Sequence, residues 1–157
     1  MERKIYFCKS WFRAKKQPTE LWTEDQARSA HQRKQPYTIL VDSIERPFCF
    51  LEVSERAAGV GFLDAFLRES LTYSFQELEP GRFFLSVATY REFVGDTDRV
   101  ASGTSYIFEQ NGTVTIRKEI FFPEYTVQES VSKTDVAANS IAKPEFGVLG
   151  DLIRVER

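Results

Sequence analysis

The chain contains few of the residues on which most enzyme sites depend. Its 157 residues include a single histidine, His31, and two cysteines. A Ser-His-Asp or Cys-His arrangement needs a histidine base, and the polar and cationic neighbours of His31 indicate a solvated side chain instead. A structural zinc site uses about four Cys or His ligands, more than the chain supplies. We therefore expect no catalytic residue of these classes, no metal and no cofactor.

Loops that bind phosphate or calcium are missing too. Gly59 and Gly61 imitate part of a dinucleotide-binding turn, but Asp64 replaces its third glycine and would repel a pyrophosphate. The chain has no Gly-x-x-x-x-Gly-Lys-[Ser/Thr] loop. Asp96 and Asp98 supply only two carboxylates before an arginine, which is too few for a calcium loop.

Long apolar runs are also absent. No run approaches the roughly 18 residues that a membrane span requires, and the N-terminus lacks the apolar stretch of a signal peptide. Cys8 and Cys49 lie within short apolar runs, where a thiol behaves as a small hydrophobe. These features predict a cytoplasmic protein without a membrane partner.

Charge is distributed unevenly along the chain. The net charge is -2, yet residues 1–36 carry nine basic and four acidic side chains, so the rest of the chain carries -7. This asymmetry indicates either complementary partners, with an acidic face for a basic protein, or a solvated surface. Residues 9–16 mix basic and aromatic side chains as nucleic-acid-binding segments do. A pI of about 5.6 argues against nucleic acid as the partner.

Aromatic residues are abundant, with 14 Phe, 6 Tyr and 2 Trp, and they favour half-buried β-structure. Alternating or continuous apolar patterns predict strands over residues 4–8, 37–41, 47–53, 71–78, 82–94, 104–109, 113–122 and 125–131. Asn111-Gly112 is the strongest hairpin signal in the chain. Pro123 makes the strand over 125–131 an edge strand.

Two helices are predicted. One begins at Pro18 or Thr19 and ends before Gln35-Pro36, because a residue that precedes proline avoids the helical region. The other spans residues 61–69, where apolar residues recur at spacings of three and four. The expected fold class is α+β in a single domain over residues 1–157. It is mainly an antiparallel β meander of six to eight strands with one or two short helices, and closure into a barrel is left open.

The C-terminal third resembles the tail of a group of small, uncharacterised bacterial proteins. The resemblance rests on residues 136–141, 143–147 and 152–157 and on the preceding hairpin over residues 106–116. The chain departs from that pattern in having no aromatic residue near Asn139 or Leu149. Some members of the group are described as immunity proteins, which neutralise a toxin by binding it. The resemblance therefore implies a bacterial protein that binds another protein, and it assigns no functional residue.

The leading hypothesis is a non-enzymatic protein-binding module, most concretely an immunity-type inhibitor that covers a partner protein. Large aromatics and an acidic body suit an interface with a basic partner. The oligomeric state is left open. The binding residues that we predict are Tyr90, Glu92, Asp96, Asp98 and Glu109.

Two alternatives belong to other classes. The first is a small-molecule carrier in which the meander closes as a barrel around a cavity lined by Phe83, Leu85, Tyr106 and Phe108. The second is an enzyme that uses two facing carboxylates without histidine. Its candidate carboxylates are Glu77, Glu79, Glu92, Glu109 and Glu119.

Overall fold

A computed structural model describes residues 3–157 and consists mainly of strands. The N-terminal part contains β1 (Ile5–Cys8), β2 (Trp11–Phe12), β3 (Gln17–Pro18), β4 (Leu21–Trp22), α1 (Glu24–Gln32), β5 (Tyr37–Val41), β6 (Cys49–Val53) and β7 (Ala57–Leu63). The C-terminal part contains β8 (Glu69–Glu79), β9 (Arg82–Phe93), β10 (Val100–Phe108), β11 (Thr113–Ile120), β12 (Thr126–Lys133), η1 (Ala137–Asn139), β13 (Ser140–Ala142) and η2 (Gly150–Ile153).

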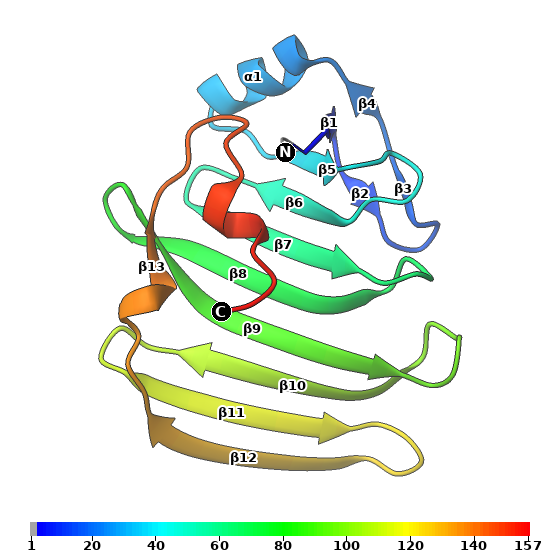
Figure 1. Cartoon of the computed structure of the whole chain (residues 1–157), viewed down its shortest axis with the longest axis vertical. Coiled ribbons are helices and arrows are strands. Elements are labelled where there is room, and N and C mark those ends of the chain that lie inside the picture. Colours follow the sequence, from blue (N-terminus) through cyan, green and yellow to red (C-terminus); the bar gives the residue numbers. More distant parts are fainter. Residues whose placement is uncertain (1–2) are drawn as a thin grey trace.

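One large antiparallel sheet organises the described residues. Its strand order is β12-β11-β10-β9-β8-β7-β6-β5-β1-β4, so each strand from β5 to β12 pairs with its neighbour in the chain (Figure 1). The C-terminal strand β13 pairs with the first residues of β9, which β10 does not reach. The α+β meander is thus confirmed, with eleven strands in the sheet of residues 3–157 instead of six to eight. The sheet stays open, with β12 and β4 at its edges.

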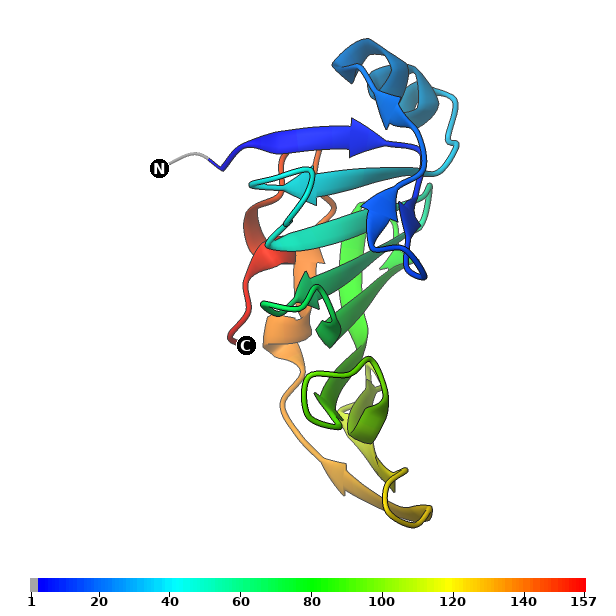
Figure 2. The same cartoon turned by 90° about the vertical axis from the view of Figure 1, so that its right-hand side faces the viewer.

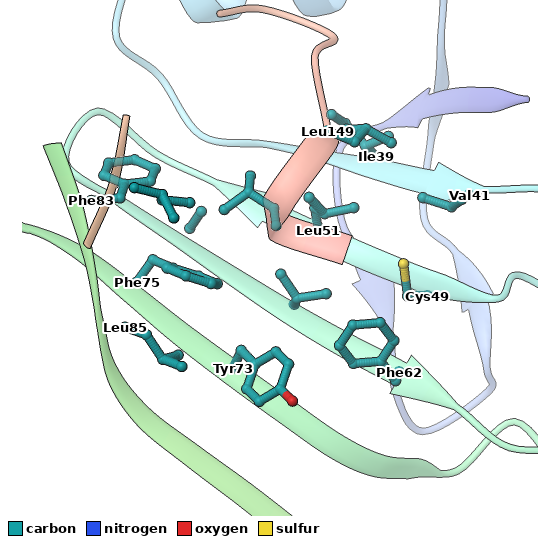
Figure 3. Close-up of a cluster of buried hydrophobic side chains, with 14 of the residues drawn as sticks. Ile39, Val41, Cys49, Leu51, Phe62, Tyr73, Phe75, Phe83, Leu85 and Leu149 are labelled. Carbon is teal, nitrogen blue, oxygen red and sulfur yellow. The ribbon is translucent and has the colours of Figure 1, made fainter. Parts of the chain in front are cut away.

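The main core lies on one face of the sheet, here called the front face. It is built from alternate residues of β5 to β9, including Ile39, Leu51, Tyr73 and Phe75, as Figure 3 shows. Helix α1 and the C-terminal segment pack over these residues (Figure 1). From that segment, Ile141, Leu149 and Leu152 are buried, and Phe146 and Ile153 pack against the core. Val148 of the same segment points away from the core and is 55% exposed.

A smaller cluster occupies the back face. Leu40 and Phe50 point away from the main core, because side chains alternate along a strand, and they pack with Cys8 and Trp11. The β2–β3 hairpin carries Trp11 over this face, where its ring stacks on Phe50 with centroids 5.8 Å apart. A sheet that is buried on both faces explains why all five residues of β5 are buried.

Helix α1 begins later than predicted. Thr23 is its N-cap: the Thr23 hydroxyl accepts from the Gln26 backbone N–H, and the Gln26 side chain accepts from the Thr23 N–H. This capping box outweighs the proline signal, and Pro18 lies in β3 instead. The predicted end is confirmed, since the helix ends at Gln32 and Lys34 adopts a left-handed conformation (φ 60°) before Gln35-Pro36.

The second predicted helix does not form. Residues 57–63 are strand β7, and Asp64 then organises a turn by accepting backbone hydrogen bonds from Phe66 and Arg68. The helical spacing was coincidental, because Val60 lies on the front face whereas Phe66 is exposed in the turn. Gly61 also favours the strand: it lies opposite Phe50, whose ring fills the space that a side chain at this position would occupy.

Candidate functional site

A cleft opens between α1, the front face of the sheet and the C-terminal segment. Its volume is about 340 Å³, within the lower part of the range for small-molecule sites. The floor is apolar and comes from β5, β6, β7 and β9 through Ile39, Leu51, Ala58 and Phe83. Polar and charged side chains from α1, β8 and the loops form the rim. These are His31, Lys34, Glu55, Arg56, Glu77 and Lys143.

The polar groups of the rim bind mainly one another. Lys143 donates to the Glu55 carbonyl (2.7 Å) and to Glu77 Oε1 (2.8 Å), and Lys34 lies 3.5 Å from Glu55 Oε1. No buried side-chain nitrogen or oxygen within residues 3–157 lacks a hydrogen-bond partner. An apolar floor below a rim in which Lys143 is already paired with Glu77 and Lys34 with Glu55 suits a mainly apolar molecule better than a charged one.

His31 belongs to this cleft, so the expectation of a solvated side chain was wrong. The side chain is half-buried, with Nδ1 2.9 Å from the Tyr37 hydroxyl and its ring edge-on to Phe146. Burial, with smaller contributions from Lys143 and Arg28, holds the pKa of His31 below its ordinary value of 6.5. Burial also raises the pKa of Tyr37 to about 12. The pair is therefore a neutral hydrogen-bonded unit at pH 7.

The cleft brings no facing carboxylates from the predicted set together. Of those five, Glu77 alone lines the cleft, and the hydrogen bond from Lys143 lowers its pKa, so that it stays ionised. Glu92 and Glu119 lie on opposite faces of the sheet, because Glu119 is paired with Gly103 and Glu92 with Ser102, the next residue of β10. Glu92 and Glu119 therefore do not face each other as the two carboxylates of a glycoside hydrolase do.

The cysteines lie apart from each other, and the described residues form no cluster of possible metal ligands. Cys8 and Cys49 are buried on opposite faces of the sheet, and burial raises the pKa of their thiols to about 11 and about 12. Within the described part of the chain, no three His, Cys, Asp or Glu side chains are placed to hold a metal ion. No helix of residues 3–157 is long and apolar enough to cross a membrane.

The cavity predicted for a carrier differs from the observed one. Phe83 lines the cleft, but Leu85 is buried in the core, and Tyr106 and Phe108 pack against that core. Because the sheet is open, the cleft lies on its front face under α1 and the tail instead of inside a barrel.

The second candidate site is the projecting sheet, by which we mean residues 87–133. These strands extend beyond the region covered by α1 and the C-terminal segment (Figures 1 and 2). Strand β12 is exposed over its whole length, and most residues of β10 and β11 are only half-buried. The large hydrophobic side chains exposed here are Tyr90, Ile107, Phe121, Phe122, Tyr125, Val127 and Val131.

Four of the five predicted binding residues lie at one end of the projecting sheet. Tyr90 and Glu92 share the front face of β9, and Asp96 and Asp98 are in the loop that follows. Tyr90 is 45% exposed and packs edge-on to Tyr106, with centroids 5.9 Å apart. Glu109 is the exception. It follows β10 at the opposite end of the strands, so grouping it with the others was wrong.

Ion pairs within the chain neutralise part of the basic charge of residues 1–36. Arg3 pairs with Asp42 (2.6 Å) and Lys16 with Asp98 (2.6 Å). Arg13 lies 2.5 Å from a Glu52 oxygen and 2.9 Å from a Glu69 oxygen. These ion pairs join the basic N-terminal region to acidic residues of the sheet and its loops. Asp98 therefore offers a basic partner less attraction than its sequence position suggested.

Sequence reasoning missed the cleft because its rim comes from distant parts of the chain, such as His31 and Lys143. No local pattern in the sequence indicates that these parts of the chain meet. Comparison of the chain with models of known families, with curated proteins and with solved structures finds no match. The geometry of the two candidate sites therefore carries the functional argument.

Proposed function

We propose that this protein is a non-enzymatic protein-binding module that holds its partner on the projecting sheet, as an immunity-type inhibitor would. The single observation that carries the proposal is the exposure of this sheet. The projecting sheet extends beyond the body, and its strands and loops keep seven large hydrophobic side chains, Tyr90 of β9 among them, at least 39% exposed. A part of a fold that keeps this many large hydrophobic side chains exposed is typical of an interaction site.

The chemistry of the front face of the projecting sheet supports a protein as the partner. The Tyr90–Tyr106 pair supplies aromatic surface with hydroxyl groups, the composition favoured at the centre of protein interfaces. Glu92 follows on the same face, and Asp96 lies in the next loop, so a polar and acidic margin borders the aromatic pair. Such a surface suits a partner that carries a basic rim.

The experiment is affinity capture of the tagged protein from extracts of its own cells, followed by native mass spectrometry. The wild-type chain is expected to retain a stoichiometric protein, and Tyr90→Ser to lose it. Phe12→Ser is the matched control, because Phe12 is a similarly exposed aromatic (42%) outside the projecting sheet. Melting curves verify that both variants fold. Recovery of the wild-type chain alone, or equal capture by Tyr90→Ser, contradicts the proposal.

A second candidate function, carriage of a small apolar molecule, is favoured by the 340 Å³ cleft. A carrier is expected to show an additional bound mass under native conditions. Val53→Phe, at the lining of the cleft, narrows it and should remove that mass while partner capture through Tyr90 is unchanged. Absence of any bound mass after incubation with a set of fatty acids and other apolar ligands contradicts this candidate.

A further inference from the structure

The outer edge of β12 is open. This strand pairs with β11 along its whole length without a register shift, and no other strand of residues 3–157 pairs with it. The opposite edge of the sheet, β4, has only two residues. In Figures 1 and 2 nothing lies beyond β12, and the chain that leaves it rises back toward η1 and β13. A regular edge of eight residues without proline is a template for another strand.

The backbone groups that face outward can be identified from the ladder. The Thr134 N–H donates to the carbonyl of Gly112, directly before the pair formed by Lys133 and Thr113. Alternate residues of an antiparallel strand point their N–H and C=O groups to the same side. Even-numbered residues of β12 therefore bond to β11, and the N–H and C=O groups of Val127, Glu129, Val131 and Lys133 face outward.

We propose that β12 pairs with β12 of a second copy of this chain, antiparallel, about a two-fold axis that passes beside Val131. In this register Val131 lies opposite Val131 of the second copy, and Glu129 lies opposite Lys133 of the second copy. The two-fold symmetry repeats the charge pair, so the interface has two opposite charge pairs that flank an apolar pair. Cross-strand pairs of both kinds stabilise antiparallel sheets.

The neighbouring symmetric registers lack this complementarity. An axis beside Glu129 places two glutamates opposite each other, and like charges in that position are destabilising. An axis beside Ser130 places Glu129 opposite Val131 and Val127 opposite Lys133, so that both charges face valines. Outward-facing residues must pair with outward-facing residues, and among these three axes only the one beside Val131 matches charge with charge.

The back face of the projecting sheet favours the same register. Val131 is 67% exposed and ends a row that continues across the sheet through Thr115 to Ile107, which is 39% exposed. Pairing at Val131 extends this row into the second copy. Arg117 already lies 3.2 Å from Glu129 in the same chain, so Lys133 of the second copy would be the second cation beside that carboxylate.

This self-association is independent of the proposed partner binding. The edge uses backbone groups and back-face side chains of β12, whereas Tyr90 and Glu92 lie on the front face of β9, three strands away. A dimer formed in this way has two front faces, both of which remain open.

The test is sedimentation velocity over a range of concentrations, with charge reversals on β12. Wild-type protein is expected to dimerise reversibly. Glu129→Lys or Lys133→Glu should each raise the dissociation constant roughly tenfold or more, because each puts two like-charge pairs in the interface. The double variant E129K/K133E should restore the dimer. Glu20→Lys is the control, because Glu20 is exposed near β4 at the opposite edge of the sheet.

Val131→Pro is the second variant. It removes an outward N–H and leaves the hydrogen bonds to β11, so the monomer should keep its circular dichroism spectrum and lose the dimer. A wild-type protein that is monomeric at every concentration overturns the proposal. So does a dimer that survives Val131→Pro or one that the double charge swap fails to restore. None of these results bears on capture of a partner through Tyr90, so the two proposals fail separately.

Discussion

Replacement of Gly61 by alanine tests the packing of the back face. An alanine Cβ at this position would lie 2.5 Å from Cζ and 2.7 Å from Cε1 of Phe50. Relief of the clash requires the ring to retreat by about 0.9 Å, from 2.5 Å to 3.4 Å. The ring is 1% exposed and stacks on Trp11, so it cannot retreat without moving that side chain. Overpacking of a well-packed core destabilises a protein by about 1–3 kcal/mol.

Gly59 provides a matched comparison, since it lies on the same face of the same strand and an added Cβ would have no neighbour within 4 Å. Gly59→Ala should be neutral or stabilising by up to about 1 kcal/mol, because glycine weakens strands. Gly61→Ala should be less stable than Gly59→Ala by about 1–3 kcal/mol. For a domain of this size that corresponds to roughly 2–4 °C in Tm per kcal/mol.

Urea unfolding of Gly59→Ala, Gly61→Ala, Phe50→Leu and the double variant F50L/G61A measures the energetic coupling between positions 50 and 61. Phe50→Leu removes the ring atoms that clash, so Gly61→Ala in that background should cost no more than Gly59→Ala does. Equal stability of Gly59→Ala and Gly61→Ala in the wild-type background would refute the reasoning.

Three further predictions concern the cleft and the cysteines. Because the pKa of His31 is lowered on folding, the unfolded chain binds a proton more readily, so stability should fall as the pH drops below 6.5. Plots of Tm against pH should show this fall for wild type and lack it for His31→Gln. Glu77 affects stability in a lower pH range. Its pKa lies below the ordinary 4.5, chiefly because of the hydrogen bond from Lys143, so its contribution to the stability of the folded state is lost as the pH falls below 4.5. Lys143→Met should flatten that lower limb of the Tm curve, and an unchanged limb would contradict the assignment. Cys8 and Cys49 are buried with raised pKa values, so a disulfide reagent at pH 8 should modify both only at the rate of unfolding. Rapid modification of the native protein would contradict their burial.

The strands were predictable because the local pattern and the tertiary environment agree. Residues 37–41 form a strand with the predicted bounds, and Gly112 adopts the positive φ (92°) that the Asn-Gly signal anticipates. The helix over residues 61–69 failed because helical spacing also arises where a strand meets a turn. The Phe50 ring and the side chain of Asp64, which decide that case, act through contacts that periodicity does not report.

The candidate sites, too, were predictable only where the local pattern determines which residues lie together. Tyr90 and Glu92 share a face because of strand alternation, and the loop with Asp96 follows directly, so their proximity was predictable. The cleft was not predictable from the sequence, because His31 and Lys143 are brought together only when the C-terminal segment crosses the sheet. The position of Glu109 depended on strand direction, since β10 runs away from the Tyr90 end.

Strand β9 pairs with β10 over residues 87–93 but with the C-terminal strand β13 over residues 82–84, so its neighbours are synthesised at different times. Its first residues, including Phe83 and Phe84, pair with β13, and Leu149 and Leu152 then cover the front-face core. On the ribosome, the meander can emerge strand by strand through local pairing, but the part of its apolar front that the C-terminal segment covers stays exposed until residues 140–153 have emerged. Until then, the nascent chain presents a surface of the kind that chaperones bind.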